Sequence, residues 1–193
     1  MTPPLTGLIL AGGQGSRMGG VDKGLVALDG RPMVAHVIAR LAPQVDALLI
    51  NANRNADTYA AFGVPVVADR HAGFVGPLAG LDAGLHRAGD GWVVTCPCDS
   101  PFAPRDLVAR LLAAAQAANA DVAMARADGQ AQPVFLLAHT RSAGALAAYL
   151  AGGGRKIDRW VTAQKHVIVD FDDCPDAFAN INTLDELAQH QKP

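Results

Sequence analysis

Short, continuous apolar runs alternate with segments of helical periodicity along this 193-residue chain. Continuous apolar runs are typical of strands buried on both faces, and the helical segments between them indicate parallel pairing. We therefore predict an α/β fold of three layers, with a doubly wound, mostly parallel sheet. The predicted strands are 7–10, 47–51, 64–68, 92–96, 122–125, 134–138 and 166–170. The predicted helices are 32–41, 57–62, 77–87, 104–118, 141–151 and 183–189.

Composition narrows the classes of function. Half of the residues are hydrophobic, 18% are charged and the formal net charge is -2, which argues against a broad surface for nucleic acid or an anionic membrane. The first residues lack a basic leader region, and their apolar run is too short to span a bilayer. We expect a cytoplasmic protein with one domain over 1–193, divided near 103 into a nucleotide-binding half (1–103) and an acceptor-binding half (104–193).

The three cysteines do not have the spacing of a zinc site. Cys96 and Cys98 flank a proline, Cys174 stands far away, and no pair of histidines accompanies them. We expect buried thiols in a strand.

The first apolar run leads into a loop rich in glycine, LAGGQGSRMGGVDKGL, at residues 10–25. The P-loop pattern fails here because Lys23 is not followed by a hydroxyl residue. Gly13, Gly15 and Gly19 resemble a dinucleotide fingerprint, but the second strand ends in asparagine rather than in an acidic residue. A long open loop remains, in which backbone N–H groups face a triphosphate and Arg17 and Lys23 neutralise its charge.

This loop resembles the signature of the molybdenum cofactor guanylyltransferases, which join GMP to molybdopterin. The run Gly19–Gly24 narrows the match to the guanylyl group within the wider nucleotidyltransferases. Further matching motifs are Asn51-Ala52-Asn53, Asp69-Arg70, Gly76–Leu81, Pro97–Pro101, Gln132–Phe135 and Asn180–Thr183. The resemblance implies a Rossmann-like nucleotidyltransferase fold, GTP as substrate, and GTP-binding residues Leu10, Ala11, Gly12, Gly13, Lys23, Asn51, Asp69, Gly76 and Asp99.

The run 92–99 is an apolar strand that ends on a carboxylate. Ligands lie at the carboxyl ends of parallel strands, and Mg²⁺ accepts one or two carboxylates together with phosphate oxygens and water. By resemblance Asp99 is the metal ligand, for Mg²⁺ or Mn²⁺, and Arg17, Lys23 and Asp99 are the catalytic residues. The alternative is that Asp99 caps the following turn or helix.

Asn51 and Asp69 each follow an apolar strand at the same predicted edge. Guanine offers N–H donors that a carboxylate accepts, and readout by hydrogen bonds rejects a wrong base strongly. The alternative for both residues is loop capping. Gly76 precedes a proline at the expected start of a helix, where the loop either walls the base pocket or binds an anion.

The acceptor side has weaker signals. Asn180 and Asn182 alternate on a short extended segment, so both are expected to face the acceptor, with turn hydrogen bonding as the alternative. Arg155, Lys156 and Arg159 precede Trp160, which fits either a site for the phosphate and ring of a pterin or a solvated basic face.

The reaction that we expect is transfer of GMP from GTP to the terminal phosphate of molybdopterin, the organic part of the molybdenum cofactor, with release of pyrophosphate. The expected partners are GTP, molybdopterin and other proteins of molybdenum cofactor biosynthesis or molybdoenzymes, with no nucleic acid and no membrane. Cytidylyl transfer, or transfer to a sugar phosphate, is the alternative within nucleotidyltransferases. An NAD(P)-dependent oxidoreductase and a noncatalytic GTP-binding protein that delivers the cofactor are the alternatives from other classes.

Overall fold

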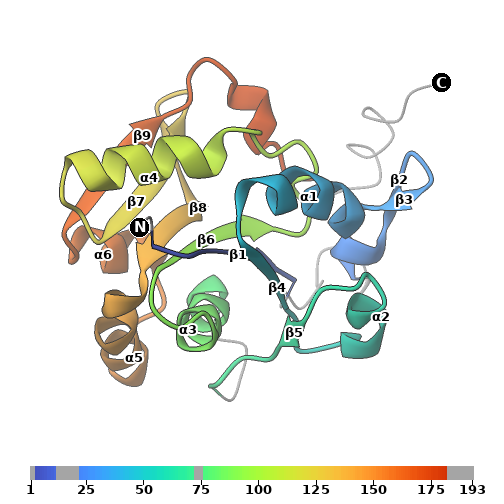
Figure 1. Ribbon diagram of the computed structural model, residues 1–193, viewed down its shortest axis with the longest axis horizontal. Coiled ribbons are helices and arrows are strands. Elements are labelled where there is room, and N and C mark those ends of the chain that lie inside the picture. Colours follow the sequence, from blue (N-terminus) through green and yellow to red (C-terminus); the bar gives the residue numbers. More distant parts are fainter. Residues whose placement is uncertain (1–2, 12–21, 72–75, 182–193) are drawn as a thin grey trace.

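The computed structural model describes residues 3–11, 22–71 and 76–181 of the chain. Within them a seven-stranded sheet has the order β5-β4-β1-β6-β8-β7-β9 (Figure 1). Its strands are β1 (Leu5–Leu10), β4 (Ala47–Asn51), β5 (Val66–Val67), β6 (Trp92–Pro97), β7 (Val122–Ala127), β8 (Gln130–His139) and β9 (His166–Asp170). The runs predicted as strands are therefore all present, although the run 64–68 contributes only two residues to the sheet.

The sheet is mostly parallel, as the sequence predicts. β1 pairs in parallel with β4 and β6, β4 with β5, and β7 with β9. β8 is the exception, because it runs antiparallel between β6 and β7. The two residues that turn β7 into β8, Asp128 and Gly129, both have positive φ angles (50° and 70°), which matches the twist of a tight hairpin.

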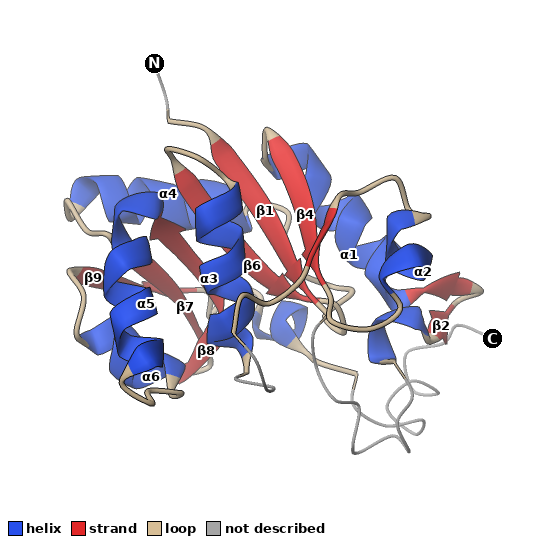
Figure 2. Cartoon of the chain, turned by 90° about the horizontal axis from the view of Figure 1, so that it is seen from below, coloured by secondary structure: helices blue, strands red, loops and turns tan. Residues whose placement is uncertain are grey.

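Helices cover both faces of the sheet, which confirms the three layers (Figures 1 and 2). On one face α1 (Met33–Leu41) and α4 (Leu107–Ala117) pack their apolar residues against the sheet. On the other face lie α3 (Pro77–Arg87), α5 (Ala143–Ala151) and α6 (Ile157–Thr162). The short helix α2 (Ala56–Ala60) follows β4 and buries Tyr59 in the core between the sheet and the helices α1 and α4.

Several elements differ from the sequence prediction. α4 begins at Leu107 rather than near Pro104, because Gln44 accepts a hydrogen bond from the backbone N–H of Val108 (3.0 Å) and donates one to the carbonyl of Pro104 (3.0 Å). The hairpin of β2 (Ala27–Leu28) and β3 (Arg31–Pro32), helix α6, and the 3-10 turns Lys23–Leu25, Ala42–Gln44, Thr140–Ser142 and Pro175–Phe178 were not predicted. The predicted helix 183–189 lies outside the described residues.

The pairing of β8 with its neighbours β6 and β7 is interrupted within the motif Gln132–Phe135. Pairing with β6 stops after Val94 and Leu137, and the register with β7 shifts between Met124 and Ala125. The buried hydroxyl of Thr95 replaces the missing ladder, because it donates to the carbonyl of Val134 (2.6 Å) and accepts from the N–H of Leu136 (3.3 Å). The strand therefore bulges beside the end of β6.

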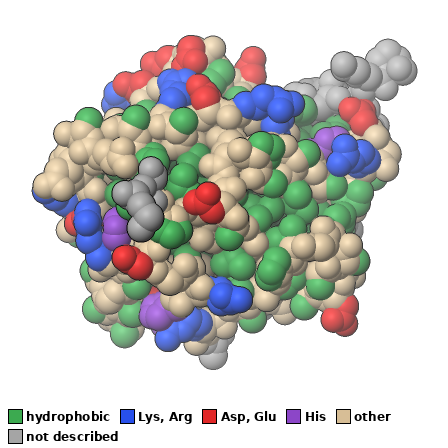
Figure 3. Space-filling model, viewed as in Figure 1, with side chains coloured by type: hydrophobic (Ala, Val, Ile, Leu, Met, Phe, Trp, Pro, Cys, Tyr) green, Lys and Arg blue, Asp and Glu red, His purple; other side chains and the backbone are tan. Residues whose placement is uncertain are grey.

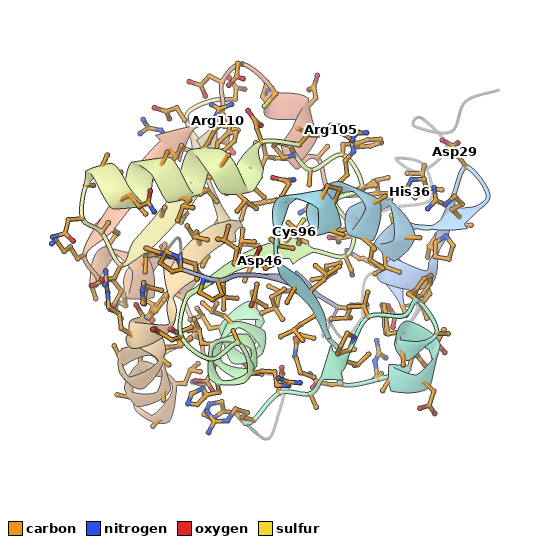
Figure 4. All side chains as sticks on the ribbon, viewed as in Figure 1. Asp29, His36, Asp46, Cys96, Arg105 and Arg110 are labelled. Atoms are coloured by element: carbon orange, nitrogen blue, oxygen red, sulfur yellow. The ribbon has the colours of Figure 1, made fainter. Side chains whose placement is uncertain are left out.

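The surface in Figure 3 carries basic and acidic side chains in mixed order. At one edge of the molecule Arg110 pairs with Asp173 (2.9 Å), and its guanidinium lies 3.8 Å from the centre of the Phe171 ring. Figure 4 places Arg110 on the outer side of α4. In the part of the chain that the structure describes, the helices are all too short or too polar to cross a bilayer.

His139, at the end of β8, gives a prediction for the pH dependence of stability. Its ring packs edge-on against Trp92 (4.8 Å between centroids), and Nδ1 accepts a hydrogen bond from the N–H of Arg141 (3.2 Å). Burial, followed by the charge of Arg141, lowers the pKa of His139. Protonation is therefore easier in the unfolded chain, so stability falls as the pH drops below the ordinary value of about 6.5.

We expect His139→Gln to lose less free energy of unfolding between pH 8 and pH 5 than the wild type, in urea titrations at both pH values. Equal losses would contradict the prediction.

Candidate functional site

Three parallel strands bring their carboxyl ends to one edge of the sheet. The N–H of Ala11 donates to the carbonyl of Asn51 (2.8 Å), and the N–H of Cys98 donates to the carbonyl of Leu10 (3.1 Å). These bonds continue the pairing of β1 with β4 and with β6 beyond the strands themselves. The glycine loop leaves the sheet between two neighbouring strand ends, which is where α/β proteins bind ligands.

Lys23 and Asp99 meet at this edge. The Nζ atom of Lys23 lies 3.4 Å from Oδ2 of Asp99, and the two side chains are 19% and 15% exposed. Lys23 stands where the glycine loop ends, in the 3-10 turn Lys23–Leu25, and Asp99 is in the turn after β6. A cation and a carboxylate from segments 76 residues apart are thus held together with access to solvent.

Asp22 anchors the segment that carries Lys23. Its carboxylate accepts hydrogen bonds from the hydroxyl of Tyr59 (2.5 Å) and from Nδ2 of Asn55 (2.9 Å), at the start of α2. Burial, with the neighbouring Cys98 and Asp22, raises the pKa of Tyr59, so its hydroxyl stays a donor. The residue that precedes Lys23 is therefore fixed to the body of the protein.

Gly24 allows the close approach on the other side of Lys23. A Cβ atom there would lie 2.5 Å from Oη of Tyr59 and 3.1 Å from Sγ of Cys98. Any larger residue would push the turn away from the end of β6, and with it the ammonium group of Lys23.

Asn51 and Asp69 form a second polar group, at the ends of β4 and β5. Nδ2 of Asn51 donates to Oδ1 of Asp69 (2.9 Å) and to the carbonyl of Val67 (3.2 Å). Asn53 holds Asp69 from the outside, since its Nδ2 donates to Oδ2 (2.8 Å) and its Oδ1 accepts from the N–H of Asp69 (2.9 Å). Each carboxylate oxygen has capacity for a further donor.

Helix α3 begins beside this second group. Gly76 has a φ angle of 80° and precedes Pro77 in the first turn, as the sequence predicts. Gly80 lies one turn further on, where an added Cβ atom would overlap Oδ1 of Asn51. The helix thus packs its backbone directly against the Asn51 side chain.

The predicted acceptor segment reaches the same edge. The N–H of Ile181 donates to the carbonyl of Asp99 (3.0 Å), and Asn180 accepts a hydrogen bond from the hydroxyl of Ser100. Asn180 therefore lies beside the turn that holds Asp99. The predicted site residues Gly12, Gly13, Arg17 and Asn182 lie outside the described residues.

The alternatives drawn from the sequence fare differently. At the start of α4 the N–H of Val108 donates to Gln44, and the N-cap residue is Asp106, so the capping role for Asp99 is wrong for that helix. Trp160 is 1% exposed in the core beneath α5 and α6, so it offers no ring face to a ligand. Arg155 donates to the carbonyls of Leu150 (2.9 Å) and Gly154 (2.6 Å), which makes it part of the turn after α5.

Cys96 is a buried thiol in β6, as expected; Cys98 is buried in the turn that follows, whereas Cys174 is half-buried and lies outside the strands. Cys96 points into the core on the side of α1 and α4 (Figure 4), and Cys98, two residues further along the chain, belongs to the same core. Burial, with a smaller effect of Asp99, raises the pKa of both thiols, so neither is a thiolate near neutral pH. Among the described residues, groups of three or more side chains able to hold a metal are absent.

Sequence reasoning missed Asp22, Tyr59 and Asn53. Their roles depend on contacts between segments far apart in the chain, and local patterns carry no sign of such contacts. Asp82 of α3 is a further buried polar residue, and its position in the apolar run LAGLDAGL is a weak sign in the sequence that a charged side chain is buried there.

Comparison with known proteins gives one family and several close relatives. Residues 7–167 match the family described as "MobA-like NTP transferase domain". A protein of Cupriavidus necator named molybdenum cofactor guanylyltransferase is 56% identical over 192 residues, which cover 97% of this chain and 96% of that protein. A protein of Ralstonia pickettii with the same name is 54% identical over 197 residues, covering 97% and 96%.

Solved structures share the fold. The molybdopterin-guanine dinucleotide biosynthesis protein A of Archaeoglobus fulgidus superposes with a TM-score of 0.81 at 24% identity, covering 96% of both chains. A Mycobacterium tuberculosis protein solved in complex with manganese has a TM-score of 0.70 at 18% identity, covering 100% of both chains.

Gly80→Ala tests whether α3 sets the position of Asn51. The new methyl group displaces Asn51 from Asp69, and the loss of this half-buried hydrogen bond costs about 1–3 kcal/mol, or roughly 5- to 150-fold in affinity. We expect this loss in nucleotide binding measured by calorimetry. Gly84→Ala is the matched control, because its methyl group would meet only Leu8 in the core. Equal nucleotide affinities for the two variants would contradict the prediction.

Proposed function

This chain belongs to the MobA-like NTP transferase family, and we propose that it transfers GMP from GTP to the terminal phosphate of molybdopterin, releasing pyrophosphate. Relatives that carry the name molybdenum cofactor guanylyltransferase match almost the whole chain. The observation that carries the proposal is the Lys23–Asp99 pair, which lies where β1 and β6 end and the glycine loop returns.

Lys23 and Asp99 are proposed to act on the phosphates. Pairing with each other lowers the cost of holding a lysine and a carboxylate at a partly buried place. With a nucleotide bound, the Lys23 ammonium group would contact phosphate oxygens, and the Asp99 carboxylate would hold a divalent cation. The loop residues Gly12, Gly13 and Arg17 are proposed to add backbone N–H groups and a second cation.

A divalent cation fits the donors present. Asp99 supplies one partly exposed carboxylate, and the described residues form no larger cluster of ligands around it. Such a site suits Mg²⁺, and equally Mn²⁺, which take most of their ligands from phosphate and water. When bound, the cation would supply further neutralisation of charge on the phosphate oxygens.

Asn51 and Asp69 are proposed to receive the guanine base, with Leu10, Ala11 and Gly76 forming the walls. Guanine presents N1–H and an exocyclic amino group side by side, and the two oxygens of one carboxylate accept both. Asn51 and Asn53 hold that carboxylate in one orientation. Adenine and cytosine do not present this pair of donors, and the buried polar groups would lose their partners.

The chemical step is an in-line displacement. An oxygen of the molybdopterin phosphate forms a bond to the α-phosphorus of GTP, and the bond from that phosphorus to the bridging oxygen of the β-phosphate breaks. The leaving pyrophosphate takes the electron pair. Because the attacking oxygen is already anionic, no side chain has to remove a proton. The protein contributes position and compensation of charge, with Lys23 and Arg17 at the pyrophosphate.

The acceptor is proposed to bind beside Asp99 from the C-terminal half of the chain, 104–193. Asn180 and Asn182 would donate to its phosphate or pterin ring, which is supported by the bond between Ile181 and Asp99. We place the reaction in the cytoplasm, where the three free thiols remain reduced, and where proteins of cofactor biosynthesis or molybdoenzymes would take the product.

Substitution of the pair tests the proposal directly. Asp99→Ala and Lys23→Ala should each lower turnover about 10²-fold or more, judged from the cost of one lost donor to a developing charge. Formation of the guanine dinucleotide from GTP and molybdopterin, followed by chromatography, measures the effect.

Matched controls exist at the opposite edge of the sheet. Asp46 precedes β4 and accepts from the N–H of Leu5 (2.9 Å), and Lys165 precedes β9. Asp46→Asn and Lys165→Ala should keep turnover within about twofold, because surface changes away from a site have small effects. A loss of tenfold or less in the Asp99 or Lys23 variant would remove that residue from its proposed role.

A further inference from the structure

Asp82 is a buried carboxylate that the proposed reaction does not use. It lies in the middle of α3, between apolar residues that pack on the sheet, and its side chain has no exposed surface. Aspartate is almost never fully buried unless it is paired, because removing its charge from water is costly. The partners of Asp82 therefore indicate what the residue is for.

Two of these partners come from the segment directly after Asp69. Nη1 of Arg70 lies 3.0 Å from Oδ2 of Asp82, and Nε2 of His71 lies 3.1 Å from the same oxygen. His86, which belongs to α3 itself, is hydrogen-bonded through Nδ1 to the backbone carbonyl of Asp82 (2.8 Å), and Oδ1 of Asp82 lies 3.4 Å from the same nitrogen. One buried carboxylate thus fastens residues 70 and 71 to the helix.

The same helix also sets the position of Asn51. Gly80 presses against the Asn51 side chain, and Asn51 donates to Asp69. Gly80 and Asp82, two residues apart in α3, therefore fix Asn51 and the segment of Asp69, respectively. Asp69 itself is held between Asn51 and Asn53 on one side and the Arg70–His71 anchor on the other.

We propose that Asp82 is a positioning residue for nucleotide selection, which fixes the Asp69 carboxylate at the angle that guanine requires. The inference rests on the proposed function, since it assumes that Asp69 receives the base. Two parallel hydrogen bonds from guanine to one carboxylate require a more exact orientation of that carboxylate than a single hydrogen bond does. A loosened Asp69 should therefore lose the contribution of the exocyclic amino group, while the chemistry at the α-phosphorus continues.

Asp82→Asn tests the proposal, with GTP compared with ITP, whose base lacks the exocyclic amino group. In the full chain we expect the KM for GTP to rise about tenfold and kcat to change less than about twofold, the pattern of lost ground-state binding. The preference for GTP over ITP in kcat/KM should fall by about the same tenfold, because a site built for a donor discriminates through it.

A second variant and a matched control separate this role from general support. Arg70→Gln combined with His71→Gln removes the anchor through side chains that are 48% and 31% exposed, so it tests the inference even if Asp82→Asn fails to fold. His86→Gln changes a neighbour of Asp82 that is hydrogen-bonded to its backbone carbonyl within α3, so this variant should keep both the KM and the GTP preference. Thermal unfolding by circular dichroism checks that each variant is folded.

Asp69→Asn distinguishes the two possible failures. If this variant keeps the KM for GTP and the preference over ITP, the proposed role of the Asn51–Asp69 pair is wrong. If Asp69→Asn changes both while the Arg70 and His71 double variant changes neither, the inference about Asp82 is overturned and the proposed function stands. The inference is also overturned if His86→Gln has the same effect as the double variant, or if kcat falls as far as kcat/KM.

Discussion

The parallel pairing of β1 with β4 and β6 is the constraint on which the site depends. Parallel strands end at the same edge, so three apolar runs separated by helices deliver Leu10, Asn51 and Pro97 to one place. The polar residues that follow these ends then need only short turns to meet. Lys23, which follows the glycine-rich segment in the sequence, lies at this edge and pairs with Asp99. Burial of apolar residues on both faces of the sheet stabilises this arrangement of the strands.

The polar groups at this edge are supported from behind by two helices. α2 fixes the segment of Lys23 through Tyr59 and Asp22, and α3 fixes the Asn51–Asp69 pair through Gly80 and Asp82. Each support places a buried or half-buried polar contact behind a more exposed functional group. In such an arrangement the exposed group is already oriented before a ligand binds, so less of the binding energy is lost in ordering it.

Much of this was predictable from the sequence, and the exceptions have physical reasons. Asp99 and Asn51 follow uninterrupted apolar runs, so their position at strand ends could be read directly. The sequence placed Lys23 at the end of the glycine loop, but its pairing with Asp99 could not be predicted, because 76 residues separate them. The start of α4 depends on Gln44, 64 residues before Val108, and the antiparallel insertion of β8 depends on a turn and on Thr95. Contacts of this kind form only after the strands have paired.

The central claim is that this edge of the sheet binds GTP together with a divalent cation. A thermal-shift panel of GTP, CTP, ATP, UTP and NADP⁺, each with and without Mg²⁺, tests it most directly. A ligand at 100 times its dissociation constant adds about 2.7 kcal/mol of stability, which raises Tm by roughly 5–10 °C for a chain of this size. The account predicts a shift with GTP alone among the five nucleotides, and a larger one with Mg²⁺. A shift with CTP in place of GTP, or with NADP⁺ alone, would contradict it.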